Sequence, residues 1–233
     1  MGKIAAIVLL LAGLCSPGVA GAVETRYELG LYSRYVWRGF TLTDGPVLQP
    51  GLRIDHPGGL SVAVWGNVDL GDESETQADF DELRLTIDYA WSPDPFEIGV
   101  GLVEYLFPGT PFPSTREVYV RFELPSLVSP RLTLYRDLEA IEGTYAELAV
   151  AYDRELGRWW RSGVELSVGY ADRDFAVGGV SGFHDGNLTV ELEYVGDRFS
   201  AGLRAGYTDS LDQRVLLDQP AGSWFGLSVG RGF

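Results

Sequence analysis

Acid–base chemistry in this chain would have to rest on very few side chains, because its 233 residues include only two histidines, His56 and His184. A serine nucleophile needs a histidine base within hydrogen-bond reach, and a carboxylate-based hydrolytic site needs paired acids beside a histidine. His56 falls in a stretch expected to form a tight turn, whereas His184 falls in a stretch expected to be a loop at the opposite end of the molecule. The two cannot share a site, and His184-Asp185 alone is only a fragment of one. We therefore expect no enzymatic activity.

A cation site is the next candidate, and the strongest sequence for it is the acidic stretch from Asp69 to Glu75 around Asp72, followed by Asp79 and Asp81. Calcium binds several carboxylate oxygens, but the spacing here is not that of an EF-hand loop. Such a run is more often a solvated loop, so cation binding near Asp72 stays open. No glycine-rich phosphate loop or metal-ligand cluster stands out in the sequence. We expect no cofactor and no resident metal.

Charge and cysteine content exclude two further classes. The chain carries 18 Lys+Arg against 33 Asp+Glu, a formal net charge of -15. Nucleic-acid binding rests on neutralising phosphates with basic side chains, so no nucleic-acid partner is expected. The single cysteine, Cys15, excludes a disulfide framework and thiolate metal sites.

The remaining charged residues alternate with apolar ones along the chain. Residues 82–91 are the clearest case, since Leu83, Leu85 and Ile87 interleave with Glu82 and Arg84. A period of two is typical of β-strands with two different faces. Segments of this kind recur from Thr25 to the C-terminus, and we count about twelve strands. Their predicted polar face holds Arg26, Glu28, Arg34, Arg38, Arg53, Glu82, Arg84, Asp88, Glu97, Glu117, Arg121, Glu147, Glu165, Glu191, Glu193 and Arg204.

Alternation fits two all-β architectures, a soluble sandwich and a membrane barrel with an apolar outside and a polar lumen. The connections alternate between tight turns, as at 55–59 and 196–198, and longer loops, as those after Leu70 and Phe107, which is the pattern of bacterial outer-membrane barrels. In lipid a sheet must also close, because every backbone polar group needs a partner. We predict a closed antiparallel up-and-down transmembrane β-barrel in the bacterial outer membrane, with lipid and lipopolysaccharide as its surroundings.

Aromatic residues cluster near the predicted strand ends. Amphipathic rings favour the two headgroup levels of a membrane, so we predict an aromatic girdle at each rim. The terminal Phe233 is similar to the signal that the outer-membrane assembly machinery recognises, which makes that machinery an expected partner. The predicted girdle residues are Tyr27, Tyr35, Trp37, Tyr89, Trp91, Tyr152, Tyr170, Tyr194, Phe199, Tyr207, Phe225 and Phe233.

The N-terminus has the parts of a secretory signal peptide. Lys3 supplies the positive charge, residues 4–14 form a short apolar run, and Ala20-Gly21-Ala22 is a small-residue cleavage site. The apolar run is shorter than the roughly 20 residues that a spanning helix needs. We predict a cleaved signal peptide over residues 1–22 and a single barrel domain over residues 23–233.

One stretch carries a family resemblance. Ser33-x-Tyr35-x-Trp37-Arg38-Gly39, then Thr43-Asp44-Gly45, the Leu48 to Leu52 segment and Val64 to Asp69 resemble the start of TorF-type porins, a family of bacterial outer-membrane proteins. The match covers about the first quarter of the chain after the signal peptide, and Pro46 and Pro50 depart from the family's usual residues. The resemblance implies a porin-like barrel. From the strand register we expect Tyr35 and Trp37 in the outer girdle, and Arg34 and Arg38 as lumen or rim charges that could meet carboxylates such as Glu82 or Asp88 from nearby strands.

The charged lumen allows two functional interpretations. Charges lining a water-filled passage would set its selectivity for small solutes, as rings of charge do in channels. Alternatively, the same charges could interlock and plug a non-conducting barrel with a structural or surface role. Barrels of about 8 strands are filled by side chains, and those of 16 to 18 strands leave a channel. A count of about twelve strands therefore does not distinguish an open lumen from a plugged one. We favour the passive channel, and the sequence leaves its solute, gating and oligomeric state open.

Overall fold

All regular secondary structure consists of β-strands in the computed structural model, which describes residues 22–71 and 79–233. No helix in this part of the chain is long and apolar enough to cross a membrane. The predicted signal peptide, except for Ala22, and Asp72 of the acidic stretch lie outside the described residues. The strands are β1 (Glu24–Tyr32), β2 (Tyr35–Trp37), β3 (Phe40–Thr43), β4 (Val47–Asp55), β5 (Leu60–Asp69), β6 (Asp79–Trp91), β7 (Glu97–Leu106), β8 (Thr115–Glu123), β9 (Ser129–Asp137), β10 (Thr144–Glu155), β11 (Trp160–Ala171), β12 (Gly182–Val195), β13 (Ser200–Ser210) and β14 (Gly222–Gly232).

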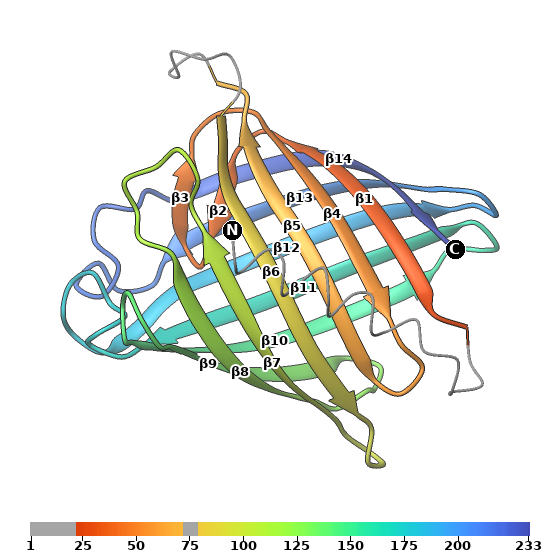
Figure 1. Cartoon of the computed structure of the whole chain (residues 1–233), viewed down its shortest axis with the longest axis horizontal. Coiled ribbons are helices and arrows are strands. Elements are labelled where there is room, and N and C mark those ends of the chain that lie inside the picture. The colour runs from red at the N-terminus through yellow and green to blue at the C-terminus, as the bar shows by residue number, and fades with distance from the viewer. Residues whose placement is uncertain (1–21, 72–78) are drawn as a thin grey trace, which may run out of the picture.

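The strands β1 and β4 to β14 form a closed antiparallel barrel, in which each strand pairs with its neighbours in sequence and β1 pairs with both β4 and β14 (Figure 1). Closure leaves no edge strand in the barrel, so every ladder position can find a partner. The predicted twelve-stranded up-and-down barrel is therefore confirmed.

The two faces of the wall follow the alternation of the sequence. Leu203 and Leu227 lie opposite each other on β13 and β14 and are 53% and 55% exposed on the outer surface. Arg26 and Arg53 lie opposite each other on β1 and β4, and both line the interior. An apolar outer surface around a polar interior is the arrangement that a barrel in lipid needs.

The two ends of the barrel differ, as the connection lengths predict. At one end, five short turns join β4–β5, β6–β7, β8–β9, β10–β11 and β12–β13, and the start of β1 and the end of β14 lie beside them, where Thr25 and Phe233 exchange backbone hydrogen bonds. At the other end, longer connections run from Tyr32 to Val47, Leu106 to Thr115, Ala171 to Gly182 and Ser210 to Gly222. We call these ends the short-turn end and the long-loop end.

The first predicted strand requires a correction. The sequence alternation runs on to Trp37, but β1 ends at Tyr32, and the following hairpin of β2 and β3 turns into the barrel interior. Tyr35 is only 6% exposed, and Trp37 packs against Tyr105 at a ring-centroid distance of 6.0 Å. The prediction that Tyr35 and Trp37 belong to an outer girdle is therefore wrong, because their rings are held inside the lumen.

The other predicted girdle residues lie on the outer face. Tyr27 and Phe233 make an edge-to-face contact at 5.9 Å near the short-turn end, and Tyr207 and Phe225 are exposed near the long-loop end. Tyr194 packs with Phe199 at 5.7 Å. Also exposed are Tyr89, Trp91, Tyr152 and Tyr170. That these rings mark the two headgroup levels stays a prediction.

The two histidines occupy different environments from each other. His56 follows β4 in a short turn, as predicted, where its Nδ1 accepts a hydrogen bond from the Gly58 backbone N–H at 3.1 Å. His184 was expected in a loop, but it lies on β12 with no exposed surface. This prediction is wrong because β12 pairs with β11 through Phe183 and Gly186, with a register shift between them, so that His184 and Asp185 lie within the strand.

Two hydrophobic clusters fill the interior near the long-loop end. One contains Tyr145, Ala171, Phe175, Ala176 and Val215, with Trp37, Phe40 and Tyr135 packed against it. The other contains Tyr32, Tyr35 and Val47, with Trp37, Trp65 and Trp224 against it. Trp37 contacts both clusters, so the hairpin of β2 and β3 lies between them.

Candidate functional site: the barrel lumen

The chain segment 33–46, which we call the inward hairpin, lies within the outline of the barrel near the long-loop end (Figure 1). It reverses at Arg38-Gly39, where both residues have positive φ, 47° and 82°. Two central residues with positive φ define the type I′ turn, which matches the twist of a two-residue hairpin. Glycine adopts this conformation freely, whereas for arginine it costs about 1–2 kcal/mol. Contacts of the Arg38 side chain must offset that cost.

Arg38 forms the central contact of the inward hairpin. Its two terminal nitrogens donate to the two carboxylate oxygens of Glu117 on β8, at 2.6 and 2.9 Å. The guanidinium carbon lies 4.2 Å from the ring centroid of Tyr135 and 4.6 Å from those of Trp37 and Tyr145. The side chains of Arg38 and Glu117 are only 7% and 2% exposed. A bidentate pair stacked between rings is the geometry in which a buried ion pair can offset its desolvation.

A second contact joins the hairpin to β6. The Tyr35 hydroxyl donates to Glu82 at 3.0 Å, and Arg84 bonds both the Glu82 carboxylate and the Tyr35 hydroxyl. The Arg84 guanidinium carbon also lies 4.6 Å from the Trp65 ring and 5.1 Å from the Tyr105 ring. The hairpin is thus held by charge and aromatic contacts to two separate parts of the wall.

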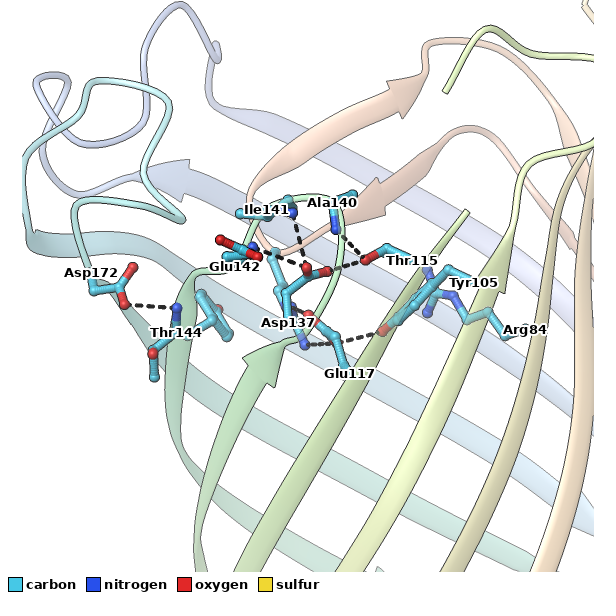
Figure 2. Close-up of polar contacts among 12 residues, drawn as sticks. Arg84, Tyr105, Thr115, Glu117, Asp137, Ala140, Ile141, Glu142, Thr144 and Asp172 are labelled. Atoms are coloured by element: carbon cyan, nitrogen blue, oxygen red, sulfur yellow. Dashed lines mark hydrogen bonds and ion pairs between the residues drawn. The ribbon is translucent and has the colours of Figure 1, made fainter. Parts of the chain in front are cut away.

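The wall around Glu117 is itself tied together (Figure 2). The Tyr105 hydroxyl donates to Glu117 at 2.8 Å, and the Thr115 hydroxyl donates to Asp137 at 2.6 Å. The other Asp137 oxygen accepts backbone N–H bonds from Ile141 and Glu142 at 2.9 and 3.1 Å. Asp137 therefore folds the loop that follows β9 over the wall strand that carries Glu117.

A similar anchor holds the loop after β11. Asp172 accepts a backbone N–H bond from Thr144 at 2.8 Å (Figure 2) and another from Phe175 at 2.9 Å. Burial alone would raise the pKa of Asp172, but these N–H groups stabilise the charged form and hold its pKa below the usual 3.8. The loop in turn places the Phe175 ring 5.2 Å from that of Tyr145 and 6.3 Å from that of Trp37. It forms part of the packing around the hairpin.

His184 and Asp185, considered from the sequence as a fragment of a hydrolytic site, lie beneath the hairpin turn. Asp185 accepts a hydrogen bond from the Tyr145 hydroxyl at 2.9 Å and lies 2.9 Å from His184 Nδ1. Both residues of the pair have no exposed surface, and the Phe40 ring lies 5.3 Å from that of His184. A buried pair covered by the hairpin offers no access for a substrate, so these side chains serve to position the turn.

On the short-turn side of the hairpin the lumen is hollow. One cavity of about 440 Å³ runs from β8 across the interior to Trp224, and a second of about 380 Å³ lies against β1, β4 and β5. Both cavities reach Arg204, so they adjoin. We call this space the vestibule. Its charged lining residues are Arg26, Glu28, Arg53, Glu123, Arg131, Asp153, Glu165, Glu191 and Arg204.

Ion pairs run along the wall of this half of the lumen. Arg53 bonds Asp55 at 2.7 Å and Asp88 at 3.3 Å, and Arg131 bonds Glu165 at 2.9 Å and lies 3.9 Å from Glu147. The further pairs are Arg26–Asp55 at 2.6 Å, Arg121–Glu97 at 3.1 Å, Arg161–Glu193 at 3.7 Å and Arg204–Glu191 at 2.9 Å.

The predicted lumen residues thus fall into distinct groups. Arg38, Glu82, Arg84 and Glu117 lie in the filled long-loop half, and Glu147 lies between the two groups, 3.9 Å from Arg131. The others apart from Arg34 lie along the short-turn half, where Asp88 is buried beside Arg53. Arg34 bonds Asp44 at 2.9 Å at the base of the hairpin. Arg34 and Arg38 therefore both meet carboxylates, as predicted, but the named examples Glu82 and Asp88 are wrong, because the inward turn carries Arg38 on to Glu117.

Sequence reasoning missed the inward-facing aromatic residues as functional side chains. Tyr105 and Tyr145 hold Glu117 and Asp185, and Tyr119 donates to Asp88 at 3.0 Å. A signal was present, because Tyr119 and Tyr145 alternate in phase with charged residues of their own strands. Their positions in the alternation place Tyr119 and Tyr145 on the polar, inward face, whereas an aromatic side chain by itself suggests the outer aromatic girdle.

The closed twelve-stranded barrel has the same fold as several solved outer-membrane porins and channels. The COG4313 outer membrane channel from Pseudomonas putida F1 is similar with a TM-score of 0.59 and 11% identity, covering 94% of this chain and 99% of that one. The KdgM porin has a TM-score of 0.58 and 11% identity, and the NanC porin 0.57 and 9%, each covering 90% of this chain and 99% of its own. At such identities the likeness shows the fold alone.

Sequence comparison adds a family match. Residues 17–132 match a family described as "Bacterial protein of unknown function (Gcw_chp)". No curated protein matches the chain. The predicted resemblance to TorF-type porins is not confirmed by this match and stays a prediction.

Proposed function

We propose that this protein is a passive outer-membrane channel for small solutes, in which the inward hairpin sets the narrowest point. The observation that carries the proposal is the vestibule, a hollow and charged space inside a closed barrel with an apolar outer surface. A water-filled lumen lined by charged side chains is what conduction through a membrane barrel requires. The porin and channel names of structurally similar proteins agree with the proposal.

The proposal includes the route and surroundings of the chain. A signal peptide over residues 1–22 would direct it to export, and the Phe233 end would engage the outer-membrane assembly machinery. The outer aromatic residues would meet lipid, and the long loops would face lipopolysaccharide. Within residues 22–71 and 79–233 the His184–Asp185 pair is fully buried, and the proposed function involves no covalent chemistry.

A non-conducting barrel is the second candidate, and one observation favours it. The inward hairpin, its ion pairs and both hydrophobic clusters fill the long-loop half of the lumen. If this packing leaves no water path, the protein would serve a structural or surface role.

Planar-bilayer conductance of the purified, refolded protein tests the proposal. Tyr32 and Val47 are directly paired, so replacing residues 33–46 by Asn-Gly would join β1 and β4 through a two-residue turn. We expect a small wild-type conductance and a much larger one in this variant. A deletion within the exposed loop 107–114 is the control and should leave conductance near that of the wild type.

The outcomes separate the two candidates. A silent wild type with a conducting hairpin-replacement variant would favour a barrel that the hairpin closes. If both proteins refold but neither conducts, and neither admits solutes into liposomes, the channel proposal fails.

A further inference from the structure

The balance of charge in the vestibule is uneven. Every arginine that faces this half of the lumen in the described residues, namely Arg26, Arg53, Arg121, Arg131, Arg161 and Arg204, lies within 4.0 Å of a carboxylate. Carboxylates are more numerous on the same wall. The fields of the arginines are therefore locally cancelled, and the surplus is negative.

The surplus can be assigned to particular side chains. Glu28 lines the cavity against β1, and Glu123 and Asp153 line the cavity against β8 and β10. Among the residues that the structure describes, none of the three forms an ion pair within 4.0 Å. Glu123 faces Arg131 across the β8–β9 register, but Arg131 already bonds Glu165. Glu28 and Asp153 are exposed to the hollow interior.

The filled long-loop half does not reverse this sign. Its arginines, Arg38 and Arg84, are each paired with a buried glutamate, Glu117 and Glu82. These pairs contribute no net charge where a solute passes the hairpin. The vestibule carboxylates therefore dominate the field along the lumen.

Because of this balance, we propose that the vestibule selects cations over anions and that Glu28, Glu123 and Asp153 are its selectivity-determining residues. The inference rests on the proposed channel function and names its solute class, small inorganic or organic cations. A lumen lined by one sign of charge within low-dielectric walls concentrates counter-ions. The preference weakens as salt rises, because the Debye length falls to about 8 Å at 0.15 M.

The test is the reversal potential of the channel in a KCl gradient at low ionic strength. We expect K⁺ to be severalfold more permeant than Cl⁻ in the wild type, and the ratio to fall toward one in the triple variant E28Q/E123Q/D153N. The matched control D174N/D218N/E139Q removes the same charge from exposed residues of the long loops and should keep the wild-type ratio. The variant R204Q frees Glu191 and should raise the ratio, which supplies a second reading if the triple variant refolds poorly.

The outcomes distinguish this inference from the function on which it rests. Channels that conduct but prefer Cl⁻, or that keep their ratio in the triple variant while the control lowers it, overturn the cation inference alone. Absence of conductance in both the wild type and the hairpin-replacement variant overturns the channel proposal and this inference together.

Discussion

The two halves of the lumen use the same residue types in opposite ways. In the long-loop half, arginines and glutamates are buried among rings, as Arg38 and Glu117 are at 7% and 2% exposure. In the short-turn half, comparable pairs such as Arg204–Glu191 are 38% and 32% exposed and border a cavity. Packing fixes the position of the first group, whereas the second group borders open space in the lumen.

The contrast between the two halves shows that charge alone does not identify a pore lining. A buried pair loses much stability when one partner is removed, because the other charge is left without compensation. An exposed pair is screened and contributes little to stability. The long-loop half should therefore respond to mutation through stability and hairpin position, and the short-turn half through ion flow.

The largest effect is expected at Arg38. Replacing Arg38 by Met leaves Glu117 buried without its partner and should destabilise the docked hairpin by about 3–5 kcal/mol. The double variant R38M/E117L should be less destabilised than R38M, because no buried charge remains. Urea unfolding followed by tryptophan fluorescence measures both. An R38M barrel as stable as the exposed-pair control R214M would contradict the difference between the two halves.

The next effect tests the two faces of the wall. Arginine at Leu85, which lies on the outer face of β6, should cost about 2–4 kcal/mol if the position sits near the bilayer midplane. Arginine at the neighbouring Thr86 points inward beside Asp88 and should be tolerated, with a change in conductance instead. Refolding yield into lipid vesicles and single-channel recording give the comparison. Equal losses at the two positions would mean that the assigned faces are wrong.

A smaller effect is expected at the hairpin turn. Gly39 has a φ of 82°, which is unfavourable for a residue with a side chain. A Cβ atom at this position would also lie 2.6 Å from Leu216 and 2.7 Å from Asp185. G39V should therefore cost about 1–2 kcal/mol from the backbone alone and loosen the hairpin, raising conductance. The control G45A keeps its nearest atom, Gly71 Cα, at 3.9 Å. If G45A raises conductance as much as G39V, the turn is not the feature that holds the hairpin.

The smallest effect concerns pH at a long loop. The folded pKa of Asp172 lies below 3.8, so its stabilising contribution is present above the unfolded pKa and is lost as the pH falls through the folded value. The Thr144 N–H donates a hydrogen bond to Asp172. Hydrogen exchange at this amide should therefore be slow at neutral pH and should become faster only when the pH falls through the folded pKa of Asp172. D172N should show faster exchange at neutral pH, by about 1 kcal/mol in opening free energy. If the Thr144 amide is equally protected in D172N, the Asp172 carboxylate does not hold this loop in place.

The sequence was sufficient for the barrel because alternation is a local property. Leu83, Leu85 and Ile87 face outward with Glu82 and Arg84 inward, as their spacing predicts. A closed sheet satisfies that pattern in every strand. The strand number and the long and short connections follow from the same local signals.

The inward hairpin was beyond such reasoning for a physical reason. Tyr35 and Trp37 continue the odd-numbered phase of Leu29 and Leu31, so periodicity carries the strand past Tyr32. The turn into the lumen depends on contacts with residues far along the chain, such as Arg38 with Glu117, 79 positions away. At the inward hairpin, two hydrophobic clusters and an ion pair stabilise a turn into the lumen more than the local alternation favours a continued strand. The residues of these contacts are far apart in the sequence, so no short window of sequence contains them.

The route of the inward hairpin has a mechanical consequence. It leaves the wall between β1 and β4 and ends on β8 through Arg38, while the Thr41 N–H bonds Gln219 in the loop before β14 at 3.0 Å. The segment is thus a strut that connects separate sectors of the ring. A hollow ring flattens under lateral pressure more readily than a braced one. The barrel is therefore stiff in cross-section at its long-loop end and compliant at its short-turn end.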